Sequence, residues 1–207
     1  MRRKSLGKKS AVKRKKRKVD TSTSKPAKQQ PADVLEFRAR TPDDDDYIVQ
    51  LTEEQLSGVH QQAFGEVFPR EQFRRYLQSG APTVVVEKAK KRIGYYSYLI
   101  NPDGKMHISA MVIEPEYQSD GIGSKVMRHL EDEARRLGAH TLEVFVQTGN
   151  EKSLGFTRKL GFVQVFYVTP TTICFQKRLD TQVGADGHAP THPRAVSQPA
   201  APGYPLL

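Results

Sequence analysis

The chain has 207 residues and a formal net charge of +10, and 37% of its residues are hydrophobic, with no tryptophan among them. That length suits one ordinary domain or a smaller domain with long tails, and the low apolar content favours the second, because the core must then come from part of the chain. No run of about 18 apolar residues occurs, and no apolar segment follows residues 1–18, so we expect neither a membrane span nor a secretory signal. The single cysteine, Cys174, excludes an internal disulfide; we expect it in the core and assign no metal site.

The positive charge is confined to one end of the chain. Residues 1–28 hold 13 Lys and Arg against one acid, whereas the rest holds 20 basic and 22 acidic residues. The basic block at 13–18 favours contact with polyanions, such as nucleic acid, ribosomal RNA or anionic lipid, and is also typical of a nuclear localisation signal. We expect a cytoplasmic protein if the source is bacterial and a nuclear or nucleocytoplasmic one if it is eukaryotic; a merely solubilising tail is the alternative.

Composition divides the chain into three parts. Residues 1–45 are predicted to be a disordered basic tail and linker, 46–180 a folded domain, and 181–207 a second disordered tail rich in proline and alanine. Residues 34–41 alternate like a short strand, but Pro42 and four aspartates follow, so this segment is assigned to the linker. His188 and His192 have helical spacing, yet the prolines between and after them prevent the helix that would align them as metal ligands. The sequence does not give the oligomeric state.

The first half of the domain reads as one strand, two helices and three strands. Residues 47–51 are predicted as a strand, and Thr52 with Gln55 is the signature of a capping box for a helix that runs to about Gly65. Pro69 opens a second helix. Strands are predicted at 83–87, 93–100 and 106–114, the last two joined by a turn at 101–104.

The second half changes to a helical period at Ile122, which predicts a helix over 122–137. A strand at 141–146, a helix at 150–160 and strands at 162–168 and 172–177 follow. This order predicts an α/β domain around a mixed central sheet, in which strands 106–114 and 141–146 are parallel and joined by a right-handed crossover.

A glycine-containing loop precedes the long helix. Residues 118–124 follow a strand that ends at Pro115, and Gly121 and Gly123 open the helix. Glycines there let a ligand approach the backbone, and the free N–H groups and dipole of the helix start favour a phosphate or pyrophosphate. The spacing is neither the dinucleotide fingerprint nor a nucleoside-triphosphate loop. A simple tight turn is the alternative.

A second segment makes the pattern specific. With the Q-x-x-G-x-G loop at 118–123 and the N-x(9)-L-G-F segment at 150–162, the chain resembles the GNAT superfamily of acetyl-CoA-dependent N-acetyltransferases over residues 46–180. The opening at 68–73 is further similar to the branch of ribosomal-protein N-terminal acetyltransferases. The resemblance implies the GNAT fold, a mixed sheet of about seven strands flanked by about four helices.

The resemblance also implies a set of residues that bind acetyl-CoA, mostly through their backbone. The strand end would hold the pantetheine arm and polarise the acetyl carbonyl, the loop would hold the pyrophosphate, and an asparagine would contact the cofactor between the two parallel strands. An N-cap without a ligand role is the alternative for the asparagine, and the carboxylate of the loop is expected to weaken binding. The residues are Met111, Val112, Ile113, Gln118, Ser119, Asp120, Gly121, Ile122, Gly123, Ser124 and Asn150.

Both side chains that relatives use for proton transfer are absent. Thr157 occupies the position of the usual tyrosine acid, and Phe145 that of the glutamate of the N-terminal acetyltransferase branch. Glu143, with the same strand parity as Phe145, and Tyr167 are the candidate substitutes. A solvent-facing Glu143 and a packing role for Tyr167 are the alternatives.

The resulting hypothesis is an enzyme that transfers acetyl directly from acetyl-CoA to a primary amine. The expected acceptor is a protein or peptide amine, either an N-terminal α-amine or a lysine, and residues 1–28 are expected to bring the protein to nucleic acid or the ribosome. The alternative is a weak or silent acetyl-CoA-binding module tethered by that tail, which the missing tyrosine and glutamate favour.

Overall fold

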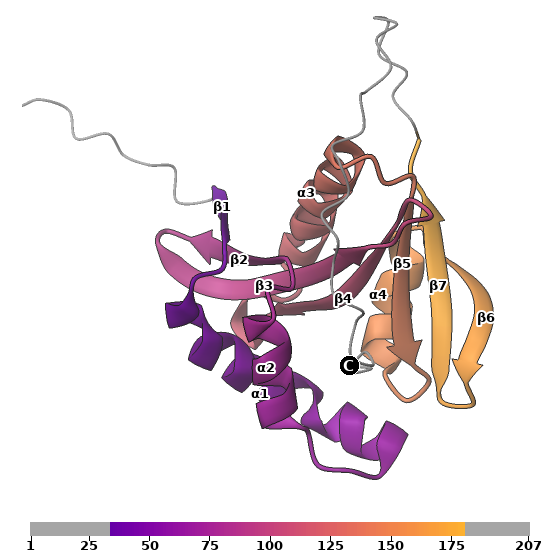
Figure 1. Cartoon of the computed structure of the whole chain (residues 1–207), viewed down its shortest axis with the longest axis horizontal. Coiled ribbons are helices and arrows are strands. Elements are labelled where there is room, and N and C mark those ends of the chain that lie inside the picture. Colours follow the sequence, from indigo (N-terminus) through magenta and orange to yellow (C-terminus); the bar gives the residue numbers. More distant parts are fainter. Residues whose placement is uncertain (1–33, 181–207) are drawn as a thin grey trace, which may run out of the picture. The chain divides into compact units, whose positions relative to one another are not determined.

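The structure is a computed structural model, and it describes residues 34–180. The predicted disordered tails at 1–33 and 181–207 lie outside the described residues. The domain consists of one sheet with helices on both faces (Figure 1). Its elements are β1 (Leu35–Ala39), α1 (Asp45–Phe64), α2 (Arg70–Gln78), β2 (Thr83–Lys88), β3 (Lys91–Ile100), β4 (Lys105–Ile113), α3 (Ile122–Arg136), β5 (Thr141–Gln147), α4 (Glu151–Lys159), β6 (Val163–Thr169) and β7 (Thr172–Arg178).

The strands lie in the order β1-β2-β3-β4-β5-β7-β6. Neighbours are antiparallel except β4 and β5, which are parallel and joined through α3. The predicted α/β class, mixed sheet and parallel pair are therefore confirmed. The predicted strands from 83 onward and both helices after residue 120 are also confirmed, with small differences at their ends.

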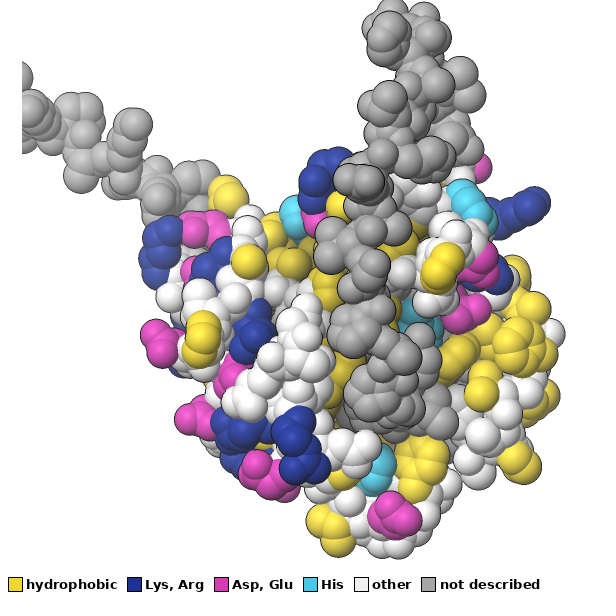
Figure 2. Space-filling view, in the orientation of Figure 1, with side chains coloured by type: hydrophobic (Ala, Val, Ile, Leu, Met, Phe, Trp, Pro, Cys, Tyr) yellow, Lys and Arg dark blue, Asp and Glu magenta, His cyan; other side chains and the backbone are white. Residues whose placement is uncertain are grey.

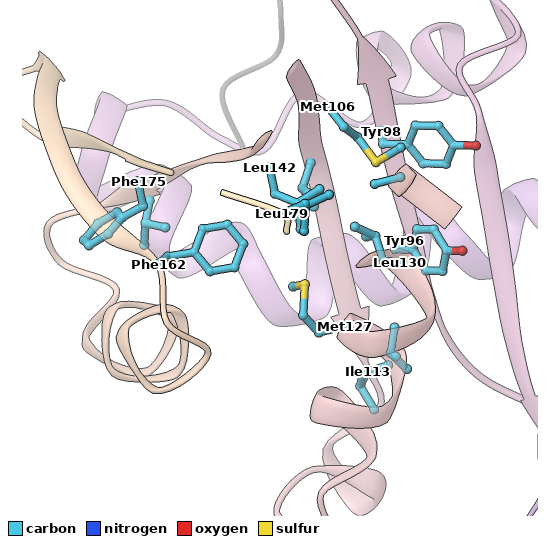
Figure 3. Close-up of a cluster of buried hydrophobic side chains, with 14 of the residues drawn as sticks. Tyr96, Tyr98, Met106, Ile113, Met127, Leu130, Leu142, Phe162, Phe175 and Leu179 are labelled. Atoms are coloured by element: carbon cyan, nitrogen blue, oxygen red, sulfur yellow. The ribbon is translucent and has the colours of Figure 1, made fainter. Parts of the chain in front are cut away.

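The two faces of the sheet carry separate hydrophobic cores. The larger core packs α3 and α4 against the sheet through residues such as Leu130, Leu142 and Phe175, as Figure 3 shows. On the opposite face, α1 and α2 pack against β2, β3 and β4 through residues such as Ile48 and Phe73. Any ligand bound in the middle of the sheet therefore has two different approaches, one from each helical layer.

The predicted strand at 47–51 is wrong, because these residues belong to α1. Ile48, Val49 and Leu51 are buried in the core, so their apolar run serves a helix that packs on the sheet. Thr52 lies inside the same helix: its hydroxyl donates to the Ile48 carbonyl at 2.6 Å and lies 2.5 Å from the Tyr95 hydroxyl. It is a buried tertiary contact and does not cap a helix.

The first strand lies earlier, in the segment predicted as linker, so the predicted domain start at residue 46 is wrong. β1 pairs with β2 through residues 35–39 and lies at one edge of the sheet. The Arg38 guanidinium donates to both carboxylate oxygens of Asp44, at 2.7 and 2.9 Å, and to Glu87 at 2.8 Å. Asp44, which is 2% exposed, also accepts from the Thr41 backbone and hydroxyl. These contacts hold the pKa of Asp44 well below its usual range, and the acidic run thus belongs to the domain.

Candidate active site

The parallel strands β4 and β5 separate part-way along their length. They pair only from Lys105 with Thr141 to Ile108 with Val144, although β4 continues to Ile113 and β5 to Gln147. A β-bulge on β4 marks the separation: Ala110 pairs with Ser97 and Ile108 with Tyr98, which leaves Ser109 as the extra residue. Bulges re-aim side chains and end strand pairing. Beyond Ser109, the side of β4 that faced β5 has backbone groups outside the parallel ladder.

A cleft lies between the two separated strands and reaches both layers of helices. Leu56 of α1 lines it from one face, and Met127 of α3 and Phe156 of α4 line it from the other. We call the end beside α3 and α4 the donor mouth and the end beside α1 the acceptor mouth. The other lining residues are Ile108, Ser109, Ala110, Met111, Val144, Phe145, Val146, Gln147, Asn150, Ser153, Thr157, Leu160 and Phe162.

The glycine-containing loop leads into α3 on the donor side. Ser119 and Gly121 have φ values of 80° and 73°, so the chain passes twice through the left-handed region before the helix begins. The first intrahelical bond runs from the Lys125 N–H to the Gly121 carbonyl, 3.1 Å. The N–H groups of Ile122, Gly123 and Ser124 precede that bond and are free to bind an anion at the positive end of the helix.

Side chains from two elements fix the position of this loop. Gln118 donates to the carbonyl of Ile113, at the end of β4, at 2.6 Å, and accepts from Lys152 of α4. A β-carbon at Gly123 would lie 3.0 Å from the Phe156 ring, so this glycine allows α4 to pack closely against the start of α3. Gly121 has open space around it and is needed for its backbone conformation.

The predicted cofactor residues divide by position. Met111 and Asn150 line the cleft. Val112 and Ile113 are buried beyond the separation of the strands and are not part of the cleft lining. Asn150 also caps α4, because its Oδ1 accepts from the Ser153 N–H at 3.0 Å. Asn150 is therefore an N-cap through its Oδ1. Because Asn150 also lies on the cleft wall, the structure is compatible with a ligand role as well.

Glu143 lies on the acceptor face of β5, one step before the strands separate. Its carboxylate accepts from Gln176 Nε2 at 2.8 Å and lies 3.5 Å from His107 Nδ1. Burial lowers the pKa of His107, only partly offset by Glu143, so the imidazole is neutral at pH 7. The His107 ring packs on Phe145, 4.5 Å between centroids, and Phe145 lines the cleft. Glu143 thus connects to the cleft through His107 and Phe145.

Cys174 completes this cluster and is buried, as expected. Its thiol donates to Glu143 Oε2 at 3.6 Å. Burial, with the nearby Glu143 carboxylate second, raises the pKa of Cys174 to about 12. A thiol with so high a pKa is not a nucleophile at neutral pH, so this chain offers no cysteine for a covalent route at this site.

The second catalytic candidate is not brought to the cleft. Tyr167 lies on β6, at the edge of the sheet beyond β7, and is 59% exposed. Thr157, at the position of the usual tyrosine, does line the cleft and is 7% exposed. Tyr167 and Thr157 therefore do not share a site, and the acid role of Tyr167 remains a prediction.

Two polar side chains that the sequence analysis did not single out lie in the cleft wall. Gln147 is 3% exposed and its Nε2 has no hydrogen-bond partner, and the half-buried Ser109 has an unpartnered Oγ. The apolar pattern contains a signal for Ser109: residues 106 and 108 alternate in phase, but the next pair is 111 and 113. Gln147 lies two residues after Phe145 and four after Glu143, so the alternation along a strand predicts that all three side chains lie on the same face of β5.

Gln147 lies where the end of α1 covers the sheet. A β-carbon at the nearby Gly149 would lie 2.6 Å from Gln62 Oε1 of α1, and Thr171 Oγ1 donates to the Ala63 carbonyl at 3.5 Å. Buried amide N–H groups are normally paired, and an unpaired one costs about 1–3 kcal/mol. An unpaired donor on the wall of a cleft is therefore suited to donate a hydrogen bond to a ligand oxygen.

The donor mouth fits two parts of acetyl-CoA that backbone groups can bind, the pyrophosphate and the pantetheine arm. Free N–H groups at the start of α3 suit a pyrophosphate, and the unpaired edge of β4 suits an extended amide-containing arm. The family model described as "Acetyltransferase (GNAT) family" matches residues 46–162. The chain belongs to this family. Acetyl-CoA is the acyl donor of GNAT acetyltransferases, which agrees with these features of the donor mouth.

Individual relatives agree on the family and differ in what they are named for. The chain is 30% identical over 112 residues to the L-amino acid N-acyltransferase MnaT of Escherichia coli K12, a match that covers 52% of this chain and 65% of that protein. The ribosomal-protein-alanine N-acetyltransferase of Brucella melitensis is a structural neighbour with a TM-score of 0.56 and 20% identity, covering 69% of this chain and 99% of that one. A third is yncA, a putative acetyltransferase of Salmonella typhimurium solved with acetyl-CoA, with a TM-score of 0.54, 20% identity and coverage of 74% and 99%.

These matches confirm the resemblance to the GNAT superfamily, and the structural neighbours include the ribosomal-protein branch. Within residues 34–180, no helix is long and apolar enough to cross a membrane. The same part of the chain contains no group of three or more His, Cys, Asp or Glu side chains placed to hold a metal ion.

Proposed function

We propose that this GNAT protein transfers acetyl from acetyl-CoA directly to the α-amino group of an amino acid or of a peptide N-terminus. The observation that carries the proposal is the cleft between β4 and β5, which reaches both helical layers. The donor would enter beside α3 and α4, and the amine would enter beside α1. Two substrates that meet in one cleft can react directly, and the buried, high-pKa Cys174 is consistent with a route that has no covalent enzyme intermediate.

On the donor side, the chain's task is to hold and orient the acyl donor. Acetyl-CoA supplies a thioester whose carbonyl carbon the amine attacks; the new N–C bond forms as the C–S bond breaks, and CoA leaves as a thiolate that takes a proton from solvent. The N–H groups at 122–124 would bind the pyrophosphate, with Gln118 and Lys152 holding the loop in position. Met111 and Asn150 would form the wall along the arm. Backbone groups of β4 beyond Ser109 would polarise the carbonyl.

On the acceptor side, Gln147 supports an amine whose α-carbon carries a carboxylate or carbonyl group. Its Nε2 is buried and unpartnered on the cleft wall, and Ser109 Oγ adds a second unpartnered polar atom. An α-amino acid and a peptide N-terminus both place a carboxylate or carbonyl oxygen next to the α-amine, whereas a lysine side chain does not. A site built to hydrogen-bond such an oxygen discriminates strongly against an amine that lacks it.

The proton released by the amine needs an acceptor, and Glu143 with His107 is a titratable pair that contacts the cleft wall through Phe145. His107 is neutral at pH 7 and lies 3.5 Å from the Glu143 carboxylate. Because Phe145 stands between His107 and the cleft, proton transfer would pass through a water molecule at the mouth. The pair would therefore act as a general base through an intervening water molecule.

The relatives support an α-amine but leave its carrier open. The match in E. coli is named for L-amino acids, and the neighbour in Brucella for the alanine of a ribosomal protein. These names share an α-amino group beside a carbonyl. The basic residues 1–28 favour a macromolecular carrier, because binding to nucleic acid or the ribosome raises the local concentration of protein acceptors. We propose that binding of residues 1–28 to nucleic acid or the ribosome also determines where the protein is located in the cell.

The test measures release of the CoA thiol by the full chain with three acceptor classes: free L-amino acids, peptides with a free N-terminus, and lysine peptides with a blocked N-terminus. Acetyl-CoA affinity is measured in parallel by calorimetry. Turnover with one or both of the first two classes and none with the third is expected. Turnover confined to blocked lysine peptides would overturn the α-amine, and absence of acetyl-CoA binding would overturn the donor site.

A further inference from the structure

The edge strand β6 exposes an unusual amount of apolar surface. Eight large hydrophobic residues are exposed among the residues that the structure describes, and five of them lie in this one strand. Figure 2 shows hydrophobic side chains gathered on the right of the domain, where Figure 1 places β6. We call these five residues the β6 patch: Val163, Val165, Phe166, Tyr167 and Val168, which are 37–65% exposed.

The β6 strand carries neither a charge nor a proline, two of the usual protections of an edge, although it contains two irregularities in its pairing with β7. It pairs with β7 on one side only, and its residues 163–169 include no charged side chain. Proteins normally place charges or prolines on such edges to prevent association. Two register shifts leave Val165 and Val168 without partners on β7, so backbone groups at these positions lie outside the β6–β7 ladder. Because β6 is the last strand of the sheet, its outer main-chain edge has no strand partner among the described residues, and its apolar side chains are exposed beside that edge.

We propose that the β6 patch is the contact between two copies of this chain, related by a two-fold axis at Phe166. A two-fold interface uses the same surface on both partners, so that surface must complement itself. If two β6 strands run antiparallel about Phe166, then Val165 of each faces Tyr167 of the other, and Gln164 faces Val168. The two sheets then continue into each other with apolar or uncharged residues opposite one another along the whole strand.

The tails of the chain are poorer occupants of this edge. Residues 181–207 contain prolines at 190, 193, 199, 202 and 205, and proline has no N–H to donate to a strand edge. Residues 1–28 carry 13 Lys and Arg, which would have to be buried against uncharged, apolar side chains. A second copy has neither cost, because β6 contains no proline and no charge.

The available area is adequate for a modest dimer. An aromatic side chain buries about 150–250 Å² when fully covered. Phe166 and Tyr167 are 49% and 59% exposed, so these two residues from both copies offer roughly 300–500 Å². The three valines and the strand backbone bring the interface toward the roughly 1,000 Å² that a specific interface needs.

The test is the molar mass of the full chain, 23.3 kDa as a monomer, measured by sedimentation equilibrium across micromolar concentrations. A dimer is expected for the native chain, and Phe166→Lys and Val165→Lys are each expected to raise the dimer dissociation constant by roughly 30-fold or more. Val67→Lys is the matched control, since Val67 is 80% exposed in the loop between α1 and α2. A monomeric native chain, or dimers unaffected by both β6 substitutions, would overturn the proposal. Dimerisation that appears only when 181–207 are removed would assign the edge to that tail and also overturn it.

A cysteine placed at the axis tests the geometry. The one native cysteine, Cys174, is buried. Under a mild copper–phenanthroline oxidant, Phe166→Cys is expected to give a disulfide-linked dimer, and Val67→Cys is not. Circular dichroism verifies that each variant is folded. Cross-linking of Val67→Cys that equals that of Phe166→Cys would show random collision and contradict the axis.

Discussion

The two mouths of the cleft differ in the groups that they offer to a ligand: one offers backbone groups and the other side chains. The donor mouth is a loop and two helix ends, where the groups free to bind a ligand are main-chain N–H groups and the glycines set the backbone path. The acceptor mouth is lined by side chains such as Gln147 and Phe145 of β5, and the Glu143 cluster, with partners on β4 and β7, lies behind Phe145. A donor that is the same throughout a family suits a backbone site, whereas an acceptor that varies among its members suits a site that side chains define.

The largest expected effect lies at the acceptor mouth. Glu143→Gln removes the carboxylate beside His107, and we expect kcat to fall about 100-fold, as for loss of a general base, with unchanged acetyl-CoA affinity. Neutral His107 is also required, and burial lowers its pKa, so the acid limb of kcat/KM is expected below pH 6.5. That limb should move in His107→Gln. Rates measured from pH 5 to 9 check both expectations.

Glu131→Gln is the matched control for this prediction. The Glu131 side chain is also 12% exposed and accepts a hydrogen bond, from Lys177, but it lies on α3 away from the acceptor mouth. An independent readout is the Cys174 thiol: Glu143 contributes to its raised pKa, so the pKa should fall in Glu143→Gln. If the pKa falls while kcat stays at the native value, Glu143 is adjacent to the site and has no part in proton transfer.

An intermediate effect is expected at the donor mouth. Gly123→Val adds carbon atoms at a position where a β-carbon already lies 3.0 Å from the Phe156 ring. The displaced helix start loses hydrogen bonds to a charged ligand, each of about 1.5–3 kcal/mol, so the acetyl-CoA dissociation constant should rise roughly 10- to 100-fold. Calorimetry measures it. Gly155→Ala on α4, where the added carbon has open space, should bind normally; equal losses in both variants would contradict a specific role for Gly123.

The smallest effect concerns the charge of the loop. Asp120 is exposed and precedes Gly121, so its carboxylate repels a bound pyrophosphate through solvent. Asp120→Asn is expected to tighten acetyl-CoA binding about twofold to threefold at low salt, and less at high salt because of screening. Asp132→Asn, late in the same helix, should leave affinity unchanged. Weaker binding in Asp120→Asn would show that the carboxylate orders the loop.

The sequence predicts most of the fold because the strands and amphipathic helices after residue 80 carry clear periods. Its start is mispredicted for a physical reason. The apolar run at 47–51 fits either a strand or a buried helix, and the fold decides through contacts with β3, such as Thr52 with Tyr95. The strand at 35–39 is tied to the domain by Arg38, which contacts Asp44 and also Glu87, 49 residues further along the chain. Local pattern contains no information about such pairs.

The sequence likewise predicts one part of the candidate site and not the other. The loop at 118–124 is recognisable because its function depends on backbone conformation, which a short motif encodes. The acceptor mouth has side chains of β4 and β5 on its wall and a cluster behind them that includes β7, and it depends on a bulge at Ser109. Glu143 was predicted from strand parity, but its link to His107 and the unpaired state of Gln147 need three-dimensional contacts.

In the proposed function, Gln147 recognises an oxygen beside the acceptor amine. The direct measurement is the ratio of kcat/KM for an accepted L-amino acid to that for its decarboxylated amine, in the native chain and in Gln147→Leu. One hydrogen bond to a carboxylate predicts a native ratio of roughly 10–100, reduced about tenfold or more in Gln147→Leu, with unchanged acetyl-CoA affinity. Thr172→Val is the control, since Thr172 is also buried with an unpartnered hydroxyl but does not line the cleft. An unchanged ratio in Gln147→Leu, or a loss of acetyl-CoA affinity in its place, would contradict the account.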